Sequence, residues 1–238
     1  MKLHIIIHEY FESPGAIEKW ANDQHHEISY TRLDEGDTLP TKCSDFDFLI
    51  ILGGPQSPAT TRDECVHFDS QKEQALIKAA IDAGKLVLGV CLGAQLMGEA
   101  LGARFEHSPH REMGVFDISL TADAADDPIF SQFPKQFPVG HWHGDMPGLT
   151  VDAKVLAKSA GCPRQIIRYA PNAYAFQCHF EFTRESIEAM LQCCAQDLDA
   201  ESDYIQGADI IKQHDYAVIN KYLFDFLNQF QQVYQSKK

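Results

Sequence analysis

The sequence contains no long apolar run and few positive charges. Nothing in its 238 residues approaches the roughly 18 consecutive apolar residues that a membrane-spanning helix needs. Residues 1–10 hold one lysine and a single run of three isoleucines, which is too short for the apolar region of a secretion signal. The 20 basic residues are outnumbered by 34 acidic ones, and the net charge of -14 disfavours binding to nucleic acid or to an anionic membrane. We therefore expect a small molecule or another protein as the partner.

Disulfide cross-links are also not expected. The chain has seven cysteines, but this number is odd and the chain is too long to need such cross-links for stability. Hydrophobic residues make up 45% and charged residues 23%, close to the averages of globular proteins. We interpret the cysteines as reduced thiols of a folded cytoplasmic protein, and ask whether one of them differs chemically from the others.

Short apolar runs alternate with amphipathic stretches along the chain. This pattern predicts an α/β fold with a mostly parallel, doubly wound sheet of the flavodoxin-like kind and helices on both faces. We expect residues 1–200 to form one domain and residues 201–238 a helical extension of the same domain. The expected strands are 3–7, 27–33 at an edge, 46–52, 86–90, 115–120, 139–141 and 154–158, followed by a hairpin of 165–169 and 173–178. The expected helices are 13–25 with Ser13 as N-cap, 70–83, 92–101, 184–198 with Thr183 as N-cap, and 208–234.

Cys91 stands at the junction of a predicted buried strand and a predicted helix, with Gly89 and Gly93 two residues away on either side. This spacing is typical of a nucleophile elbow, with cysteine in place of serine. The sharp turn strains the central residue and leaves no room for side chains at the flanking positions. A helix N-terminus stabilises a thiolate. The alternative is a buried structural cysteine beside two glycines that pack a helix.

His179 and Glu181 are the predicted partners of this thiol. His179 ends an apolar strand, and in an extended chain Glu181 points to the same side. The carboxylate can therefore orient the imidazole while the imidazole accepts the proton of Cys91. The alternative is an ordinary polar end to a strand.

A third candidate element is the turn Gly53-Gly54-Pro55, which follows another predicted parallel strand. Ligands of open α/β sheets bind at this edge. Backbone N–H groups of glycines can approach a reacting carbonyl closely and form an oxyanion hole. Taken alone, the turn is better interpreted as a plain connection between strand and helix.

Three motifs thus follow one another: Gly53-Gly54-Pro55, Gly89-Val90-Cys91-Leu92-Gly93-Ala94-Gln95 and Gln177-Cys178-His179-Phe180-Glu181. In this order they resemble the signatures of class I (triad-type) glutamine amidotransferases, above all the glutaminase half of guanosine monophosphate synthetase and its stand-alone relatives. The resemblance covers about residues 45–185, and it includes the segments 111–114 and 141–145.

The resemblance implies a role for each matching residue. Cys91 would attack the side-chain amide of glutamine, His179 would transfer protons, and Glu181 would orient His179. The N–H groups of Gly54 and Leu92 would form the oxyanion hole beside Gly53, and Gln95 would hold the glutamine. The loop with Trp142, Gly144 and Asp145 would line the substrate pocket. No cofactor is expected.

The chain departs from the family at two positions. The family usually has proline between the catalytic histidine and glutamate, where this chain has Phe180, and an aromatic residue where it has Cys178. Proline would fix the path of the chain to Glu181. The geometry of the His179–Glu181 pair is therefore an open question, although we expect activity to persist.

The sequence has neither a Ser-Gly-Gly-x-Asp-Ser loop nor a Gly-Lys-Ser/Thr loop for ATP phosphates. Any synthetase that accepts the ammonia would therefore be a separate chain. A γ-glutamyl peptidase and a catalytically silent binding module are the alternative functions. A metal site at His141 and His143 is a further alternative, but we expect no metal because the sequence shows no additional ligands at suitable spacing. The apolar stripe 222–230 of the last helix would cover the sheet or dock a partner.

Overall fold

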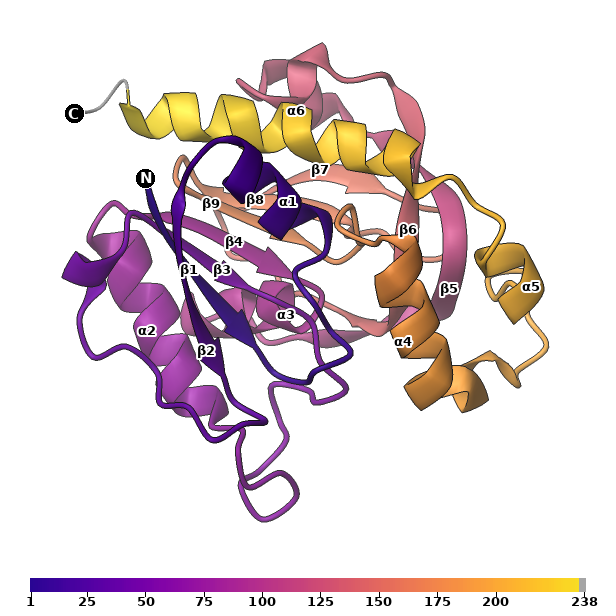
Figure 1. Cartoon of the computed structure of the whole chain (residues 1–238). Helices are drawn as coiled ribbons and strands as arrows, with labels where there is room; N and C mark the ends of the chain where they lie inside the picture. Colours follow the sequence, from indigo (N-terminus) through magenta and orange to yellow (C-terminus); the bar gives the residue numbers. More distant parts are fainter. Residues whose placement is uncertain (236–238) are drawn as a thin grey trace.

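The computed structural model describes residues 1–235, in which a nine-stranded sheet lies between helices (Figure 1). The strands are β1 (Lys2–Ile7), β2 (Glu27–Arg32), β3 (Phe48–Ile51), β4 (Leu86–Val90), β5 (Glu106–Leu120), β6 (Gln136–Met146), β7 (Lys154–Lys158), β8 (Ile166–Ala170) and β9 (Ala173–Phe176). The helices are α1 (Ala16–Asp23), α2 (Ser70–Asp82), α3 (Leu92–Ala100), α4 (Arg184–Cys194), α5 (Ala208–Ile211) and α6 (Tyr216–Gln235). Four short 3-10 turns are η1 (Cys43–Asp45), η2 (Ala122–Asp126), η3 (Phe130–Gln132) and η4 (Ala195–Leu198). No helix of this described part is both long and apolar enough to cross a membrane.

The sheet has a parallel half and an antiparallel half. Its strand order is β2-β1-β3-β4-β9-β8-β7-β5-β6. The first five strands in this order pair in parallel, and the remaining pairs are antiparallel. The predicted α/β fold is confirmed, and β2 lies at the predicted edge.

Helices cover both faces of the parallel half, as predicted. Ile5 packs in a core that includes residues of α1 and α6, whereas the next residue, Ile6, packs in a core with α2 and α3. This alternation follows from the extended backbone, in which successive side chains point to opposite faces. Both faces are buried, so the inner strands β3, β4 and β9 consist of continuous apolar runs, whereas the edge strand β2 alternates polar and apolar residues.

The antiparallel half differs from the prediction in its extent. The sequence predicts two short strands, 115–120 and 139–141. The structure instead has the long hairpin of β5 and β6, whose pairing register shifts between His107 and Glu112. The N-terminal part of β5 is polar and mostly exposed, so it lacks the apolar pattern by which a strand is recognised.

Two helix boundaries also differ. The first helix begins at Ala16 rather than Ser13, because Gly15 adopts a positive φ of 48° and serves as the N-cap. A side chain at Gly15 would lie 2.2 Å from the carbonyl oxygen of Glu181, so this turn is shaped by a contact distant in sequence. The expected helix 208–234 is divided into α5 and α6, and the expected helix 184–198 ends as η4.

The apolar stripe of α6 covers the sheet. Leu223, Phe226, Leu227 and Phe230 are at most 1% exposed and belong to the core shared with α1. The indole N–H of Trp20 in α1 also donates to the α6 side chain of Asn228. Of the two predicted roles for this stripe, the structure supports the covering role.

Candidate active site

Cys91 occupies a strained turn between β4 and α3. Its φ of 51° and ψ of -107° are unusual for a residue with a side chain, and such a conformation costs about 1–3 kcal/mol. The backbone N–H of Cys91 donates to Phe176 of β9, which holds the turn against the neighbouring strand. The thiol is 7% exposed and lies at the N-terminus of α3, where the helix dipole favours a negative charge.

The two glycines of the elbow are required by close backbone contacts. A β-carbon on Gly93 would lie 2.2 Å from the carbonyl oxygen of Ile51, and one on Gly89 would lie 2.4 Å from the carbonyl oxygen of Gly93. Neither position can hold a side chain without moving a strand or the helix. The spacing of glycines around Cys91 therefore has the structural cause that the sequence suggested.

His179 and Glu181 form a buried pair just beyond β9. The imidazole Nδ1 lies 2.5 Å from Oε1 of Glu181, and the two residues are 0% and 5% exposed. Burial opposes protonation of His179, but the charge of Glu181 and the nearby Cys91 thiol outweigh it and raise the pKa of His179 well above its ordinary value. Nε2 is buried and makes no hydrogen bond within the described residues.

The backbone around this pair is held from three directions although Phe180 replaces proline. His179 exchanges two backbone hydrogen bonds with Gly140 of β6, and its ring stacks on Phe182 with centroids 4.1 Å apart. The side-chain amide of Asn220 in α6 donates to the carbonyls of Phe180 and Phe182 at 2.8 and 2.9 Å.

The carbonyl of Glu181 in turn accepts from the N–H of Ala16 in α1. Phe180 itself is fully buried and packs against Phe176, with ring centroids 4.9 Å apart. These contacts constrain the path of the chain to Glu181, and the pair is formed without proline.

Gly53 and Gly54 follow β3 and lie beside the elbow. A β-carbon on Gly54 would lie 3.0 Å from the side chain of Leu92, and one on Gly53 would lie 3.4 Å from the β-carbon of Cys91. No hydrogen bond within the described residues uses the backbone N–H of Gly54 or Leu92. Both donors are thus available to a ligand beside the thiol.

His8 fixes the orientation of the Gly53–Gly54 peptide. Its Nδ1 lies 2.8 Å from the carbonyl oxygen of Gly53, and its Nε2 lies 2.9 Å from Oε2 of buried Glu73. Burial opposes protonation, but the charge and hydrogen bond of Glu73 raise the pKa of His8, so that both ring nitrogens can donate. Because C=O and N–H of a trans peptide point in opposite directions, this contact directs the Gly54 N–H away from His8.

Six of the ten predicted site residues line one pocket of about 280 Å³. Its lining includes Gly54, Cys91, Gln95, Trp142, Gly144 and Asp145. Gly53, Leu92, His179 and Glu181 are not part of the lining, and the pair of His179 and Glu181 is buried.

The pocket walls are joined to neighbouring elements by side-chain contacts. Gln95 donates to Gln177 at 3.1 Å, and Asp145 lies 2.6 Å from His107. The indole N–H of Trp142 donates to Asp197 in η4 at 3.0 Å, and Arg111 reaches the same carboxylate. The loop after α4 thereby closes one side of the pocket.

Glu12 is a pocket residue that the sequence did not reveal. Its Oε2 lies 2.7 Å from the position that a β-carbon of Gly53 would take, so its carboxyl group fills the space above that glycine. Burial raises the pKa of Glu12, and the charge of His179 opposes this. Glu12 thus brings a carboxyl group from the β1–α1 loop to the pocket that also holds the Cys91 thiol.

Glu112, His141 and His143 form a buried cluster that meets the pocket at His143, with potential ligand atoms within 4.8 Å of one another. Glu112 was not predicted here, because it comes from β5. Its carboxylate accepts hydrogen bonds from Ser159, Gln165 and the N–H of Gly161. Burial lowers the pKa of His141 to about 3, so the imidazole is neutral. We interpret the cluster as a polar network that joins β5 and β6 to the segment after β7, and the absence of a metal here stays a prediction.

Four residues of the site could not be assigned from the sequence. His8, Glu12, Asn220 and Asp197 act on the site from elements distant in sequence. Only two features of the sequence could have pointed to them. Glu12 is a polar residue beside the turn Ser13-Pro14-Gly15, and Asn220 is a polar residue within an apolar stripe.

The chain is similar to known proteins over its whole length. The family model described as glutamine amidotransferase class-I matches residues 14–194. The chain is 46% identical over 239 residues to the glutamine amidotransferase-like protein YfeJ of Salmonella typhimurium, and the match covers 100% of both proteins. It is 38% identical over 116 residues to the glutamine-hydrolysing GMP synthase of Thermomicrobium roseum, a match that covers 48% of this chain and 20% of that protein.

Solved structures agree with this similarity. The crystal structure of SMU.1228c superposes with a TM-score of 0.94 at 47% identity, covering 97% of this chain and 100% of that chain. A glutamine amidotransferase from Thermotoga maritima superposes with a TM-score of 0.84 at 20% identity, covering 97% of each chain. The second comparison supports the fold alone.

Proposed function

Since this chain belongs to the class I glutamine amidotransferase family, we propose that it hydrolyses the side-chain amide of L-glutamine with Cys91 as nucleophile. The observation that carries the proposal is the strained elbow of Cys91 beside the buried pair of His179 and Glu181. A thiol, a base and a residue that orients the base are the parts that nucleophilic acyl transfer requires.

The first half of the reaction forms a thioester. The Cys91 thiol transfers its proton to Nε2 of His179, and the sulfur attacks the amide carbon of glutamine. The resulting oxyanion accepts hydrogen bonds from the N–H groups of Gly54 and Leu92. His179 then protonates the leaving nitrogen, and ammonia departs from the γ-glutamyl thioester.

The second half releases glutamate. His179 accepts a proton from a water molecule, which attacks the thioester carbon through a second oxyanion. The carbon–sulfur bond breaks, and the Cys91 thiolate recovers its proton from His179. Throughout, Glu181 stabilises the charged imidazole and keeps Nε2 directed toward the sulfur.

The pocket walls supply the substrate contacts. We assign Gln95, Trp142, Gly144 and Asp145 to binding of the glutamine, because they line the pocket that holds Cys91. His8 is a positioning residue. It binds the Gly53 carbonyl and so orients the Gly54 N–H, but it does not line the pocket.

We also propose that the ammonia passes to a synthetase on another chain in the cytoplasm, where reduced cysteines are the norm. All seven cysteines are free, and the sequence has no ATP phosphate loop. Residues 201–238 are proposed as part of the same catalytic domain, because Asn220 of α6 binds the backbone on both sides of Glu181.

The test is covalent labelling with a glutamine-mimicking diazoketone, which alkylates an activated thiol as dinitrogen leaves. Mass spectrometry should find one adduct on Cys91, and L-glutamine should slow its formation. A label distributed over other cysteines, or none at all, would contradict the proposal. The Cys43→Ser variant is the matched control, because Cys43 is a half-buried thiol in η1 and its loss should leave labelling unchanged.

A parallel assay compares L-glutamine with γ-glutamyl dipeptides as substrates. Faster release of ammonia from glutamine supports the glutaminase. Much faster cleavage of the dipeptides would instead favour a γ-glutamyl peptidase with the same residues.

A further inference from the structure

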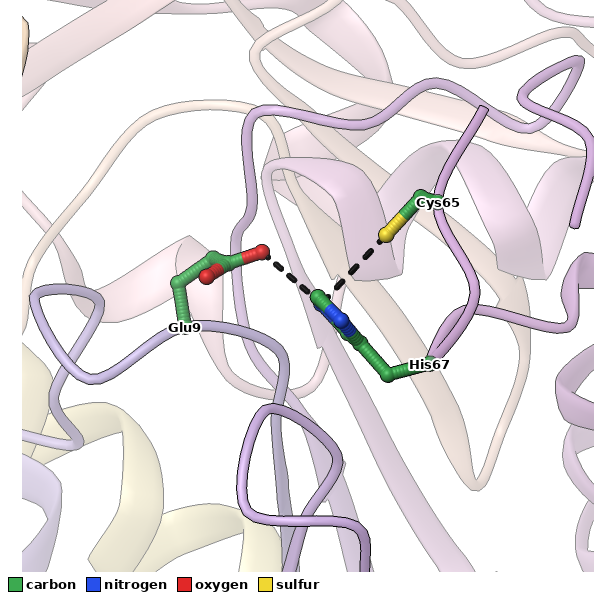
Figure 2. Close-up of side chains that lie close together, drawn as sticks. All are labelled: Glu9, Cys65 and His67. Carbon is green, nitrogen blue, oxygen red and sulfur yellow. Dashed lines mark hydrogen bonds and ion pairs between the residues drawn. The ribbon is translucent and has the colours of Figure 1, made fainter. Parts of the chain in front are cut away.

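Glu9, Cys65 and His67 form a second group of reactive side chains, separate from the proposed catalytic residues (Figure 2). Glu9 follows β1, and Cys65 and His67 lie in the segment before α2. Nε2 of His67 is 3.0 Å from Oε1 of Glu9 and 3.3 Å from Sγ of Cys65. All three potential ligand atoms lie within 4.8 Å of one another.

The arrangement differs from a proton relay. In a relay the acid binds one ring nitrogen and the thiol faces the other; around His179, Glu181 binds Nδ1 and leaves Nε2 free for the proposed proton transfer. Here Glu9 and Cys65 approach the same nitrogen of His67 (Figure 2). One nitrogen carries at most one proton, so it cannot serve both neighbours fully, whereas a metal cation can bind a carboxylate, an imidazole and a thiolate at once.

We propose that Glu9, Cys65 and His67 bind a single zinc ion, with water as the fourth ligand. When zinc binds, the Cys65 S–H bond breaks, a Zn–S bond forms and the proton passes to the solvent. Carboxylate, imidazole and thiolate are the ligands found at zinc sites, and three protein ligands with water in the fourth position form a coordination set that zinc is known to use.

The two separations that involve His67 are close to those of a tetrahedral zinc site, and the oxygen of Glu9 and the sulfur of Cys65 lie within 4.8 Å of each other. With ordinary bond lengths, the ligand atoms are about 3.4 Å apart for nitrogen and oxygen and about 3.6 Å apart for nitrogen and sulfur. The observed separations of 3.0 and 3.3 Å require each pair to move apart by only about 0.3–0.4 Å.

Gln56 supplies the outer contacts that zinc ligands commonly have. Its side-chain amide donates to Oε1 of Glu9 at 2.6 Å and to Sγ of Cys65 at 3.5 Å. These bonds favour the carboxylate and the thiolate, which are the forms that bind metal. The side chains of Glu9 and His67 are 17% and 27% exposed, so a zinc ion can enter from solvent.

The proposed zinc site lies next to the pocket that holds Cys91. Gln56 lines the active-site pocket and follows Gly54 by two residues, while Glu12, another lining residue, donates its backbone N–H to the carbonyl of Glu9. A zinc ion would therefore tie the loop after β3 to the loop after β1. The two loops form one wall of the pocket.

The experiment is a titration of the full chain with Co²⁺, which replaces zinc and reports its ligands by absorption. It is done in the Cys91→Ser background, so that the active-site thiol contributes nothing and the result does not depend on the proposed glutaminase. We expect one equivalent of Co²⁺ to produce a thiolate charge-transfer band and tetrahedral visible bands, and one equivalent of Zn²⁺ to remove both.

Matched variants identify the ligands. Adding Cys65→Ser should abolish the charge-transfer band, and adding His67→Asn or Glu9→Gln should weaken binding. Cys43→Ser and His25→Asn should change nothing, because these residues lie outside the cluster. Gln56→Ala should weaken binding about tenfold, as expected for an outer contact. The absence of a band, or a band that survives Cys65→Ser, would overturn the proposal.

A second measurement uses the unmodified chain and does not depend on the folding of variants. Alkylation of individual cysteines is followed by mass spectrometry with and without Zn²⁺. Zinc should slow alkylation of Cys65 and leave that of Cys43 unchanged. Equal rates at Cys65 in both conditions would contradict the site.

Discussion

Gly54 and Cys91 follow the ends of two parallel strands, β3 and β4, whereas Trp142 and Asp145 lie within an antiparallel strand, β6. The proposed nucleophile and one oxyanion donor thus belong to short turns at one edge of the parallel half. Three of the four proposed substrate contacts, Trp142, Gly144 and Asp145, belong to the long hairpin of β5 and β6, and the fourth, Gln95, belongs to α3. The proposed reaction chemistry therefore depends mainly on the geometry of local turns, while most of the proposed substrate contacts depend on where the hairpin lies.

The largest expected effect is a loss of kcat when the turn between β4 and α3 loses its thiol. Cys91→Ser should lower kcat for glutamine hydrolysis by about 10³-fold or more, because the hydroxyl is a far weaker nucleophile at neutral pH. Ammonia release under saturating glutamine measures the effect. A loss below tenfold, with the fold intact by circular dichroism, would remove Cys91 from the proposed role.

The next effect concerns packing in the parallel half. Gly93→Ala should lower the free energy of unfolding by about 3 kcal/mol, because the new β-carbon would lie 2.2 Å from the Ile51 carbonyl oxygen. Urea denaturation measures it. The control is Gly207→Ala, at a position with no atom within 4 Å and no positive φ, which should change stability by less than about 0.5 kcal/mol.

The helix α6 should matter for the pair of His179 and Glu181. Asn220→Ala removes the donor to the buried carbonyls of Phe180 and Phe182, which should cost about 2 kcal/mol of stability. It should also lower kcat more than it raises KM, because the base is displaced while the pocket walls stay. An unchanged kcat in the folded variant would show that α1 and β6 alone hold the pair.

The antiparallel half should contribute acid sensitivity through His141. Burial lowers the pKa of His141, beside Glu112 and His143, to about 3, so between that value and its ordinary pKa the unfolded chain binds a proton that the folded chain does not. Stability should therefore fall with acidification below pH 6.5, by about 1 kcal/mol per pH unit from this residue. Urea midpoints from pH 6.5 to pH 4 should fall less steeply for His141→Gln than for the parent, while exposed His25→Asn follows the parent. Parallel slopes for all three would contradict the assignment.

The smallest effect is expected at the pocket wall. Trp142→Phe removes the half-buried hydrogen bond to Asp197 and should raise KM for glutamine about threefold with little change in kcat. Steady-state kinetics separate the two constants. A large loss of kcat would instead mean that the antiparallel half takes part in the chemistry and would break the comparison.

The sequence was sufficient for the local features of this site. The strand 86–90 and the start of α3 were predicted correctly, and Thr183 was correctly identified as the N-cap of α4. The elbow could be read because its glycines, strand and helix are contiguous. The length of the β5–β6 hairpin was not predictable, because its polar part is held by pairing with β6 rather than by its own apolar pattern.

By itself the sequence determined the α/β class, the motifs that identify the family and the single cysteine placed at an elbow, since each depends on residues near one another in the chain. The tertiary structure alone decided that Asn220 holds the backbone around Glu181 without proline, that His8 orients the Gly53 peptide, and that Glu9 meets Cys65 and His67. These are contacts between distant segments, and packing of the whole chain sets their distances. No spacing in the sequence encodes them.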